Sequence, residues 1–143
     1  MRNNSKKTHT DIVREELLFL KNQEITNSAT GIKASFGITG INKMLSNTAV
    51  NKSIRRGFTR DEHLDAVAEI KALFENAKLY KIDGDDKNNS PNVKSIKRFI
   101  SEINDRNFAY ITVKESIIYG HRIYSLELKE INKALLDEGK PKI

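Results

Sequence analysis

The spacing of apolar residues changes along this chain, and that change constrains the fold more than any other feature of the sequence. In the first half, apolar residues recur at the three- and four-residue intervals of an amphipathic helix. After the polar stretch 83–92, apolar and polar residues alternate, which is typical of half-buried strands. Helices that precede a set of strands favour an α+β fold over an alternating α/β fold. We therefore predict N-terminal helices followed by an antiparallel β-sheet.

Two helices are predicted ahead of the strongest one. Thr10 is placed to cap the first, whose apolar residues have helical spacing. Thr48 is placed to cap the second, AVNKSIRR, which Gly57 ends as a C′ glycine. A half-buried strand at 32–38 and a short helical turn at 41–45 separate the two helices.

The strongest helix signal begins at Thr59. Glu62 follows at the third position of the helix and completes a capping box with Thr59. The apolar stripe of this helix runs from Leu64 to Ala77, and His63 lies at its rim in the first turn. The positive end of the helix dipole disfavours an imidazolium there, so we expect the pKa of His63 to be lowered somewhat.

The second half predicts three strands and a closing helix. The strands are expected at 93–103, 108–114 and 122–128, and residues 116–120 can join the last two as a hairpin. The last strand places four side chains on one face: Arg122, Tyr124, Leu126 and Leu128. A short helix is expected around Ile131, Ala134 and Leu135.

Length and composition bound the organisation of the chain. We expect its 143 residues to form a single α+β domain at 9–138, with a disordered or linker segment at 1–8 and a tail at 139–143. The chain has no cysteine, which excludes disulfides, thiolate catalysis and cysteine-rich zinc sites. No apolar run approaches the ~18 residues of a membrane span, so we expect a soluble protein.

Positive charge exceeds negative charge and is concentrated in one stretch. Lysine and arginine outnumber aspartate and glutamate by 25 to 19, which favours an anionic partner such as nucleic acid, with a basic solubility face as the alternative. No phosphate-binding glycine loop, nucleophile elbow or metal-ligand spacing occurs, so we predict no cofactor and no metal site. The concentrated cations are Lys33, Lys43, Lys52, Arg55, Arg56 and Arg60.

A histidine beside these cations suits phosphodiester chemistry. A metal-free ribonuclease needs a group that titrates near neutrality and a cation that stabilises the scissile phosphate. His63 follows the basic stretch, and we assign it as general base or acid, with His121 as the second proton-transfer group. The alternative for His63 is a first-turn histidine that only hydrogen-bonds a neighbouring loop.

The remaining site assignments concern phosphate and RNA contacts. We assign Lys43 and Lys52 as phosphate stabilisers and Ser46 and Ser53 as hydroxyl contacts at the reacting phosphate. A solvated helix surface is the alternative for each of these residues, and a core or rim aromatic is the alternative for Tyr124. The RNA-binding set is Lys33, Lys52, Arg55, Arg56, Arg60 and Tyr124.

Four segments carry a family resemblance: TGIKASFGITGINKMLSN, KSIRRGF, HLDAVAEIKALFENA and FAYITVKESIIYGHRIYSLELKEI. Together they resemble a large polyvalent protein-associated domain over residues 27–131. Such domains occur in phage and conjugative-element proteins and in bacterial polymorphic toxins. The positions that match the family's polar motif are Thr30, Lys43, Ser46, Lys52, Ser53 and His63.

The resemblance also implies a function. Related small domains from these systems belong to the barnase/EndoU/colicin/RelE-like group of metal-independent ribonucleases. We therefore expect a toxin domain that cleaves tRNA by 2′-hydroxyl attack in the bacterial cytoplasm, delivered within a larger secreted protein by a system such as contact-dependent inhibition. A toxin implies an acidic immunity protein as its partner. The alternatives are a non-catalytic nucleic-acid- or protein-binding module of a phage or mobile-element protein, and a nucleotide-using transferase.

Overall fold

The computed structural model describes residues 7–83, 93–104 and 107–130 of the chain. Within them the helices are α1 (His9–Leu20), α2 (Ile38–Met44), α3 (Asn47–Arg55), α4 (Arg60–Ala68) and α5 (Ile70–Asn76). The strands are β1 (Ile25–Thr26), β2 (Lys33–Ser35), β3 (Lys78–Asp83), β4 (Val93–Glu102), β5 (Asn107–Ser116) and β6 (Gly120–Glu130). The predicted α+β class is confirmed.

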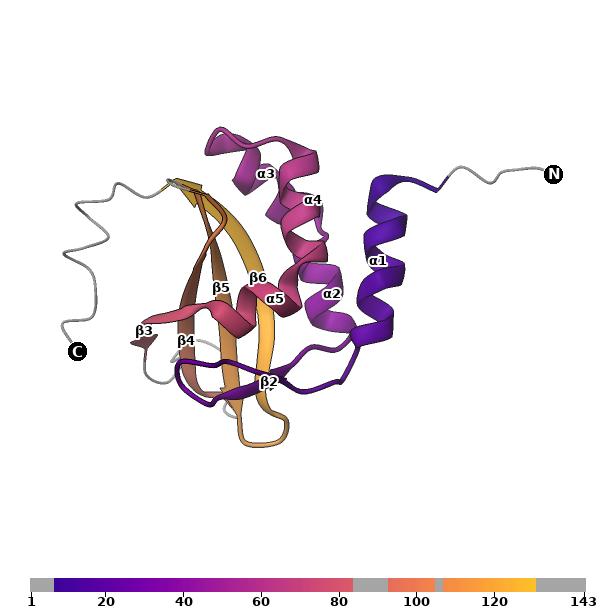
Figure 1. Ribbon diagram of the computed structural model, residues 1–143. Helices are drawn as coiled ribbons and strands as arrows, with labels where there is room; N and C mark the ends of the chain where they lie inside the picture. Colours follow the sequence, from indigo (N-terminus) through magenta and orange to yellow (C-terminus); the bar gives the residue numbers. More distant parts are fainter. Residues whose placement is uncertain (1–6, 84–92, 105–106, 131–143) are drawn as a thin grey trace.

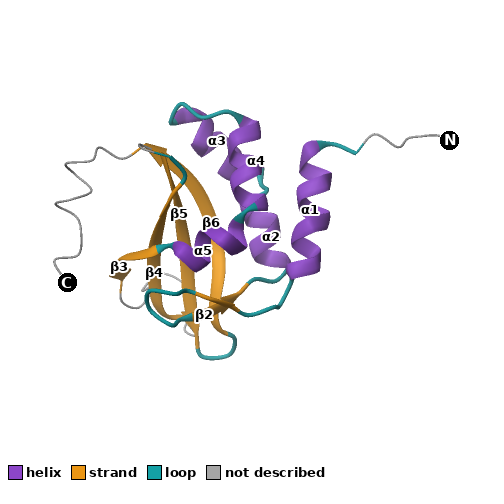
Figure 2. Cartoon of the chain, viewed as in Figure 1, coloured by secondary structure: helices purple, strands orange, loops and turns teal. Residues whose placement is uncertain are grey.

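The strands form one six-stranded sheet in the order β1-β2-β6-β5-β4-β3. From β3 to β6, each strand pairs antiparallel with the next one in sequence. β2 joins this meander at its β6 edge and runs parallel to β6, with Ala34 opposite His121. The helices pack against one side of the curved sheet (Figure 1), and Figure 2 shows the two layers by secondary structure. The sheet is therefore mostly antiparallel, with one parallel pair that the prediction did not include.

Apolar side chains from both layers form one continuous core. Phe74 of α5 meets Phe99 of β4 edge to face, with the ring centroids 5.0 Å apart. This aromatic pair packs α5 against the sheet. The other large core side chains come from α1, α2, α4 and the three long strands, and they include Leu17, Ile41, Met44, Leu64, Ile111, Ile123 and Leu126.

The helix predicted to run from Thr59 to Ala77 is divided in two. Its capping box is present, with the Thr59 hydroxyl accepting from the Glu62 N–H and the Glu62 carboxylate accepting from the Thr59 N–H. The chain leaves helical geometry at Glu69, where φ is −96° and ψ is 18°, and this residue ends α4 and precedes α5. Ile70 is fully buried just beyond the break, so both helices contribute to the same core.

The starts of two helices differ from the prediction. Ser46, not Thr48, is the N-cap of α3, and its hydroxyl accepts from the Ala49 N–H. Thr8, not Thr10, caps α1. In each case the predicted and the observed cap are hydroxyl residues two positions apart. Serine and threonine both favour N-cap positions, so local preference does not distinguish the two candidates.

Three strand predictions are also corrected. The strand expected at 32–38 is only the short β2, because α2 already begins at Ile38. β3 was missed, since its sequence KLYKID does not alternate regularly between apolar and polar residues, and it lies at the edge of the sheet. A β-bulge opposite Thr112 and Val113 changes which side chains of β6 face the core, so Tyr124 does not share a face with Leu126 as predicted.

Several predicted segments lie outside the described residues. They are the polar loop at 84–92, the final helix around Ile131, Ala134 and Leu135, and the tail at 139–143. The domain limits 9–138 therefore stay a prediction. No helix in the described part of the chain has the length and apolarity that a membrane span requires.

A close backbone contact between α2 and β6 generates a test of the packing. A Cβ placed on Gly40 would lie 2.6 Å from the Ile123 carbonyl oxygen. Gly40→Ala gains up to about 1 kcal/mol in helix propensity, but overpacking against a rigid backbone costs about 1–3 kcal/mol. We expect a net loss in the free energy of unfolding, measured by urea denaturation. Thr39→Ala, at an exposed position of the same helix, is the control. A stabilised Gly40→Ala protein would show that α2 can move away from β6.

Candidate nucleic-acid interface

The junction of α2 and α3 lies beside β6 and encloses a small polar hollow with a volume of about 90 Å³. Lys43 comes from the last turn of α2, Lys52 from α3, and Tyr124 from β6. The hollow therefore brings together residues from two distant parts of the chain, between Lys43 and Glu127. Its lining is Lys43, Ser46, Thr48, Ala49, Lys52, Tyr124, Ser125 and Glu127.

Two ammonium groups contact the aromatic ring at this hollow. The Lys114 Nζ lies 3.8 Å from the centroid of the Tyr124 ring, and the Lys43 Nζ lies 5.2 Å from it. Both distances fall within the range of cation–π attraction. The ring thereby holds two positive charges beside the hydroxyl groups of the hollow.

Glu127 pairs with the other cations of the hollow. Its carboxylate lies 2.6 Å from Arg56 Nη1 and 3.6 Å from Lys52 Nζ. Burial raises the pKa of Glu127, but the hydrogen bond from Arg56 and the charges of Lys52 and Arg56 outweigh it and hold that pKa below its ordinary value. Glu127 is therefore ionised at neutral pH, and it offsets part of the positive charge of the hollow.

A second group of aromatic and basic side chains continues across the same face of the sheet. Tyr110 alternates along β5 with the core residue Ile111 and thus faces away from the described helices. The Lys129 Nζ lies 4.0 Å from the centroid of its ring, and the Arg98 guanidinium lies 6.0 Å from it. Tyr80 of β3 packs edge to face against Tyr110, with the centroids 6.2 Å apart.

Two residues of the predicted site lie behind the hollow, in the core. Ser53 and His63 are both fully buried. The Ser53 hydroxyl oxygen lies 2.8 Å from His63 Nδ1 and 3.3 Å from the Leu128 amide nitrogen, and His63 Nε2 lies 2.8 Å from the Met44 carbonyl oxygen. The expectation that His63 lies at the rim of its helix stripe is thus corrected.

The partners of His63 define its protonation state. The Met44 carbonyl can only accept, so Nε2 carries the hydrogen and Nδ1 accepts from the Ser53 hydroxyl. The Ser53 oxygen in turn accepts from the Leu128 N–H. Burial lowers the pKa of His63, which agrees with a neutral ring and with the predicted direction, although the physical cause is desolvation more than the helix dipole.

This buried chain positions the residues that line the hollow. Met44 follows Lys43, Ser53 follows Lys52, and Leu128 follows Glu127 in the sequence. Each buried partner of the hydrogen-bond chain therefore places a neighbouring charged residue at the surface. The predicted site therefore divides into buried residues, such as Ser53 and His63, and residues that line the hollow, such as Lys43 and Lys52.

Two more hydroxyls of the predicted polar motif have structural partners. Ser46 accepts from the Ala49 N–H and donates to the Lys43 carbonyl, so it joins α2 to α3. Thr30 donates to the Asn27 side-chain oxygen at 2.8 Å. The fully buried Asn27 amide donates to the Phe74 and Ala77 carbonyls. Thr30 thus supports the contact between the 27–32 loop and the end of α5.

His121 lies in a separate polar cluster at the end of the sheet. Its Nε2 is 3.1 Å from Lys97 Nζ, which also donates to Ser95 and to Glu115. Burial and the charge of Lys97 lower the pKa of His121, although Glu115 opposes them. The side chain of His121 is 21 % exposed, unlike that of His63.

The remaining predicted cations do not join the hollow. Lys33 is exposed on β2, and Arg55 is exposed in the last turn of α3. Arg60 donates to the Thr10 hydroxyl and so links α4 to α1. Among the described residues, no group of three His, Asp or Glu side chains has an arrangement that could hold a metal ion.

Sequence reasoning missed Lys114, Glu127 and the buried Asn27. Lys114 and Glu127 belong to alternating strands, and alternation indicates which residues face solvent but not what they meet across the sheet. No local signal distinguishes Asn27 from a turn asparagine. All three required knowledge of which distant segment is adjacent.

The buried histidine generates a prediction about stability and pH. Its folded pKa lies below the ordinary value of 6.5, so the unfolded state binds the extra proton as pH falls. Its contribution to stability is therefore complete above pH 6.5 and declines below it. We expect His63→Gln to lower the free energy of unfolding at pH 7.5 by about 2–4 kcal/mol. It should also flatten the decline between pH 7.5 and 5.5, measured by urea denaturation.

His9 provides the control with the opposite sign. Its hydrogen bond to Asp61, above all, raises its pKa, so its contribution is present at low pH and is lost as pH rises through the folded pKa. His9→Gln should therefore steepen the rise of stability with pH. Parallel pH profiles for the parent and His63→Gln would mean that His63 is not held neutral.

Comparison with known families identifies one family that matches this chain. The profile of the large polyvalent protein-associated domain 3 family matches residues 4–124, most of the 143 residues. The match includes α1 to α5 and reaches Tyr124, so it covers the hollow and the buried chain except for the end of β6. Searches of curated proteins and of solved structures found no match. The resemblance to a large polyvalent protein-associated domain is confirmed, and the chain belongs to the large polyvalent protein-associated domain 3 family.

Proposed function

We propose that this domain is a nucleic-acid-binding module, and that it takes single-stranded RNA on the face formed by the α2–α3 junction, β6 and β5. The observation that carries the proposal is the Tyr124 ring, which has Lys43 and Lys114 within 5.2 Å of its centroid beside a hydroxyl-lined hollow. Family membership indicates a domain of a phage or mobile-element protein, which is compatible with a nucleic-acid ligand.

The chemistry of the face suits a single strand. An unpaired base that stacks on the Tyr124 ring takes the place of the ammonium group above it, and the displaced ammonium groups can bind the phosphates on either side of the base. Tyr110 with Lys129 and Arg98 repeats the same combination further along the sheet. The net charge of +6 adds attraction at long range. Duplexes expose no base faces, so stacking favours single strands over double helices.

The ribonuclease hypothesis requires more than binding. A base must reach the 2′-hydroxyl of the substrate, but both nitrogens of the buried His63 already have partners. His121 is more accessible, yet it belongs to the Lys97 cluster. Binding without cleavage therefore explains the geometry with fewer rearrangements. The narrower hypothesis of a tRNA-cleaving toxin with an acidic immunity protein depends on the same cleavage and is tested with it.

Binding is tested with a fluorescein-labelled oligouridylate in chelator over a series of salt concentrations. We expect the logarithm of the affinity to fall linearly with the logarithm of salt. Lys43→Ala should reduce the magnitude of that slope by about one, because one phosphate contact is lost. Tyr124→Ala should lose about 1–3 kcal/mol of binding through stacking, with Tyr124→Phe close to the parent. Fluorescence anisotropy measures each affinity, and thermal unfolding confirms that each variant is folded.

Lys21→Ala removes the same charge from the exposed end of α1 and is the matched control. If Lys43→Ala and Lys21→Ala lose the same affinity for oligouridylate, the loss comes from net charge alone, and the proposed face is contradicted. The same samples are run on a denaturing gel. RNA fragments with 2′,3′-cyclic phosphate ends would favour the ribonuclease over the binding module, and their loss in His121→Ala or His63→Ala would identify the histidine involved.

Removal of the carboxylate from the hollow gives the opposite expectation. Glu127→Gln frees Arg56 and Lys52 from their ion pairs. We expect oligouridylate to bind roughly threefold more tightly, with a steeper salt dependence, because more cations then face the phosphates. Glu16→Gln, an exposed carboxylate of α1, controls for the change in net charge. Weaker binding by folded Glu127→Gln would place the RNA elsewhere.

A further inference from the structure

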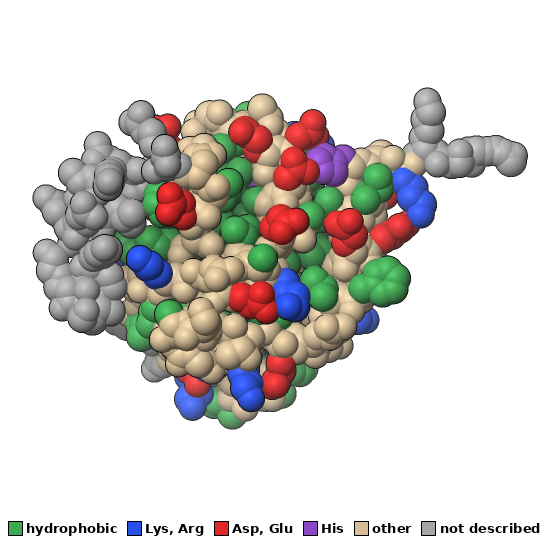
Figure 3. All heavy atoms as spheres, viewed as in Figure 1, with side chains coloured by type: hydrophobic (Ala, Val, Ile, Leu, Met, Phe, Trp, Pro, Cys, Tyr) green, Lys and Arg blue, Asp and Glu red, His purple; other side chains and the backbone are tan. Residues whose placement is uncertain are grey.

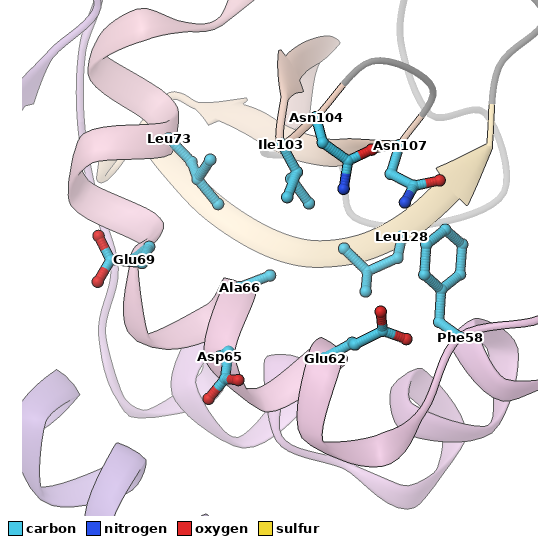
Figure 4. Close-up of a pocket in the computed structure, with 10 residues that line it drawn as sticks. All are labelled: Phe58, Glu62, Asp65, Ala66, Glu69, Leu73, Ile103, Asn104, Asn107 and Leu128. Carbon is cyan, nitrogen blue, oxygen red and sulfur yellow. The ribbon is translucent and has the colours of Figure 1, made fainter.

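A second and larger hollow lies between the helical layer and the far end of the sheet. Its volume is about 270 Å³, and it is bounded by α4, α5, the end of β4 and the end of β6. Figure 4 shows apolar side chains from both layers that point into it. These are Phe58, Ala66, Leu73, Ile103 and Leu128. Ile103 is 43 % exposed, so the lining is open to a ligand.

Carboxylates form one rim of this groove. Glu62 and Asp65 lie three residues apart on α4, and Glu69, which ends this helix, follows four residues after Asp65. The distance from Glu62 to Glu69 along the helix is about 10 Å at 1.5 Å per residue. On this side of the molecule, acidic side chains gather over α4 with apolar side chains between them (Figure 3).

Two of these three carboxylates have polar partners among the described residues, and the third has no ion-pair partner there. Glu62 accepts from the Thr59 N–H, and Asp65 pairs with His9 at 3.0 Å. Glu69 forms no ion pair with any residue in the described part of the chain. None of the described residues that line this groove is a lysine or an arginine. The charged side chains among the described lining residues are therefore all acidic, in a protein whose net charge is +6.

We propose that this groove binds a protein segment in which a large apolar side chain lies beside lysine or arginine. The apolar floor has the size for one or two such side chains, and burial of each is favourable by about 25 cal/mol per Å². The carboxylates attract the flanking cations, and a rim about 10 Å long spans more than one residue of the partner. Phosphate groups would be repelled, so this site is distinct from the proposed RNA face.

The proposal is tested with a labelled synthetic peptide of alternating leucine and lysine. A peptide of leucine and glutamate and a lysine-only peptide are the matched probes. The overall positive charge of the protein repels the cationic peptides, so their capture requires a local acidic site. We expect only the leucine–lysine peptide to bind. Its affinity should fall roughly fivefold in Glu69→Lys and tenfold or more in Ile103→Asp, and it should weaken as salt is added.

Glu24→Gln, an exposed carboxylate between α1 and β1, should leave the affinity unchanged. Equal binding of the acidic peptide, or equal affinity of the parent and Glu69→Lys, would overturn the proposal. Analytical ultracentrifugation of the protein alone supplies a second reading. Self-association that Glu69→Lys abolishes would assign the groove to a second copy of this chain and would also overturn it. Oligouridylate binding by the same variants should change by no more than the altered net charge produces, which separates this site from the RNA face.

Discussion

The hydrogen-bond chain through His63 is the interaction on which the helical layer depends. It joins the end of α2, the last turn of α3, the start of α4 and β6 through Met44, Ser53 and Leu128. Each donor has one acceptor, so a single tautomer of the neutral ring satisfies all of them. A buried polar group without partners costs about 1–3 kcal/mol. The four segments therefore have one relative arrangement in which no polar group of the chain is left unsatisfied.

This constraint links the interior to the proposed binding face. Lys43, Lys52 and Glu127 each precede a member of the buried chain, so the arrangement of the interior determines where these charges emerge. Tyr124 is placed by a different device, the β-bulge that turns it away from the core. A phosphate contact needs cations at defined separations, and a rigid scaffold supplies them. The acidic groove is lined by other residues, from α4, α5 and the ends of β4 and β6, so the two proposed sites do not compete for the same residues.

Some of the fold could be predicted because the signals are local. The capping box at Thr59, the glycine at 57 and the alternation of the late strands each depend on residues that are near one another in sequence. Predictions failed where two local choices were equally good, as for Ser46 against Thr48, or where the pattern was weak, as in β3. The structure brings some of the candidate residues together and separates others. Lys43, Ser46, Lys52 and Tyr124 do line one hollow, but the sequence could not separate them from the buried Ser53 and His63.

The sequence by itself determined the α+β class, the family and the presence of a basic, hydroxyl-rich stretch, because periodicity, composition and motif spacing are properties of neighbouring residues. The tertiary structure decided which of those residues face solvent and which lie in the core. Burial of His63 follows from the packing of four segments around it, and the charge on the hollow follows from Glu127 of a distant strand. Such effects depend on contacts between residues far apart in the chain, and no local pattern encodes them.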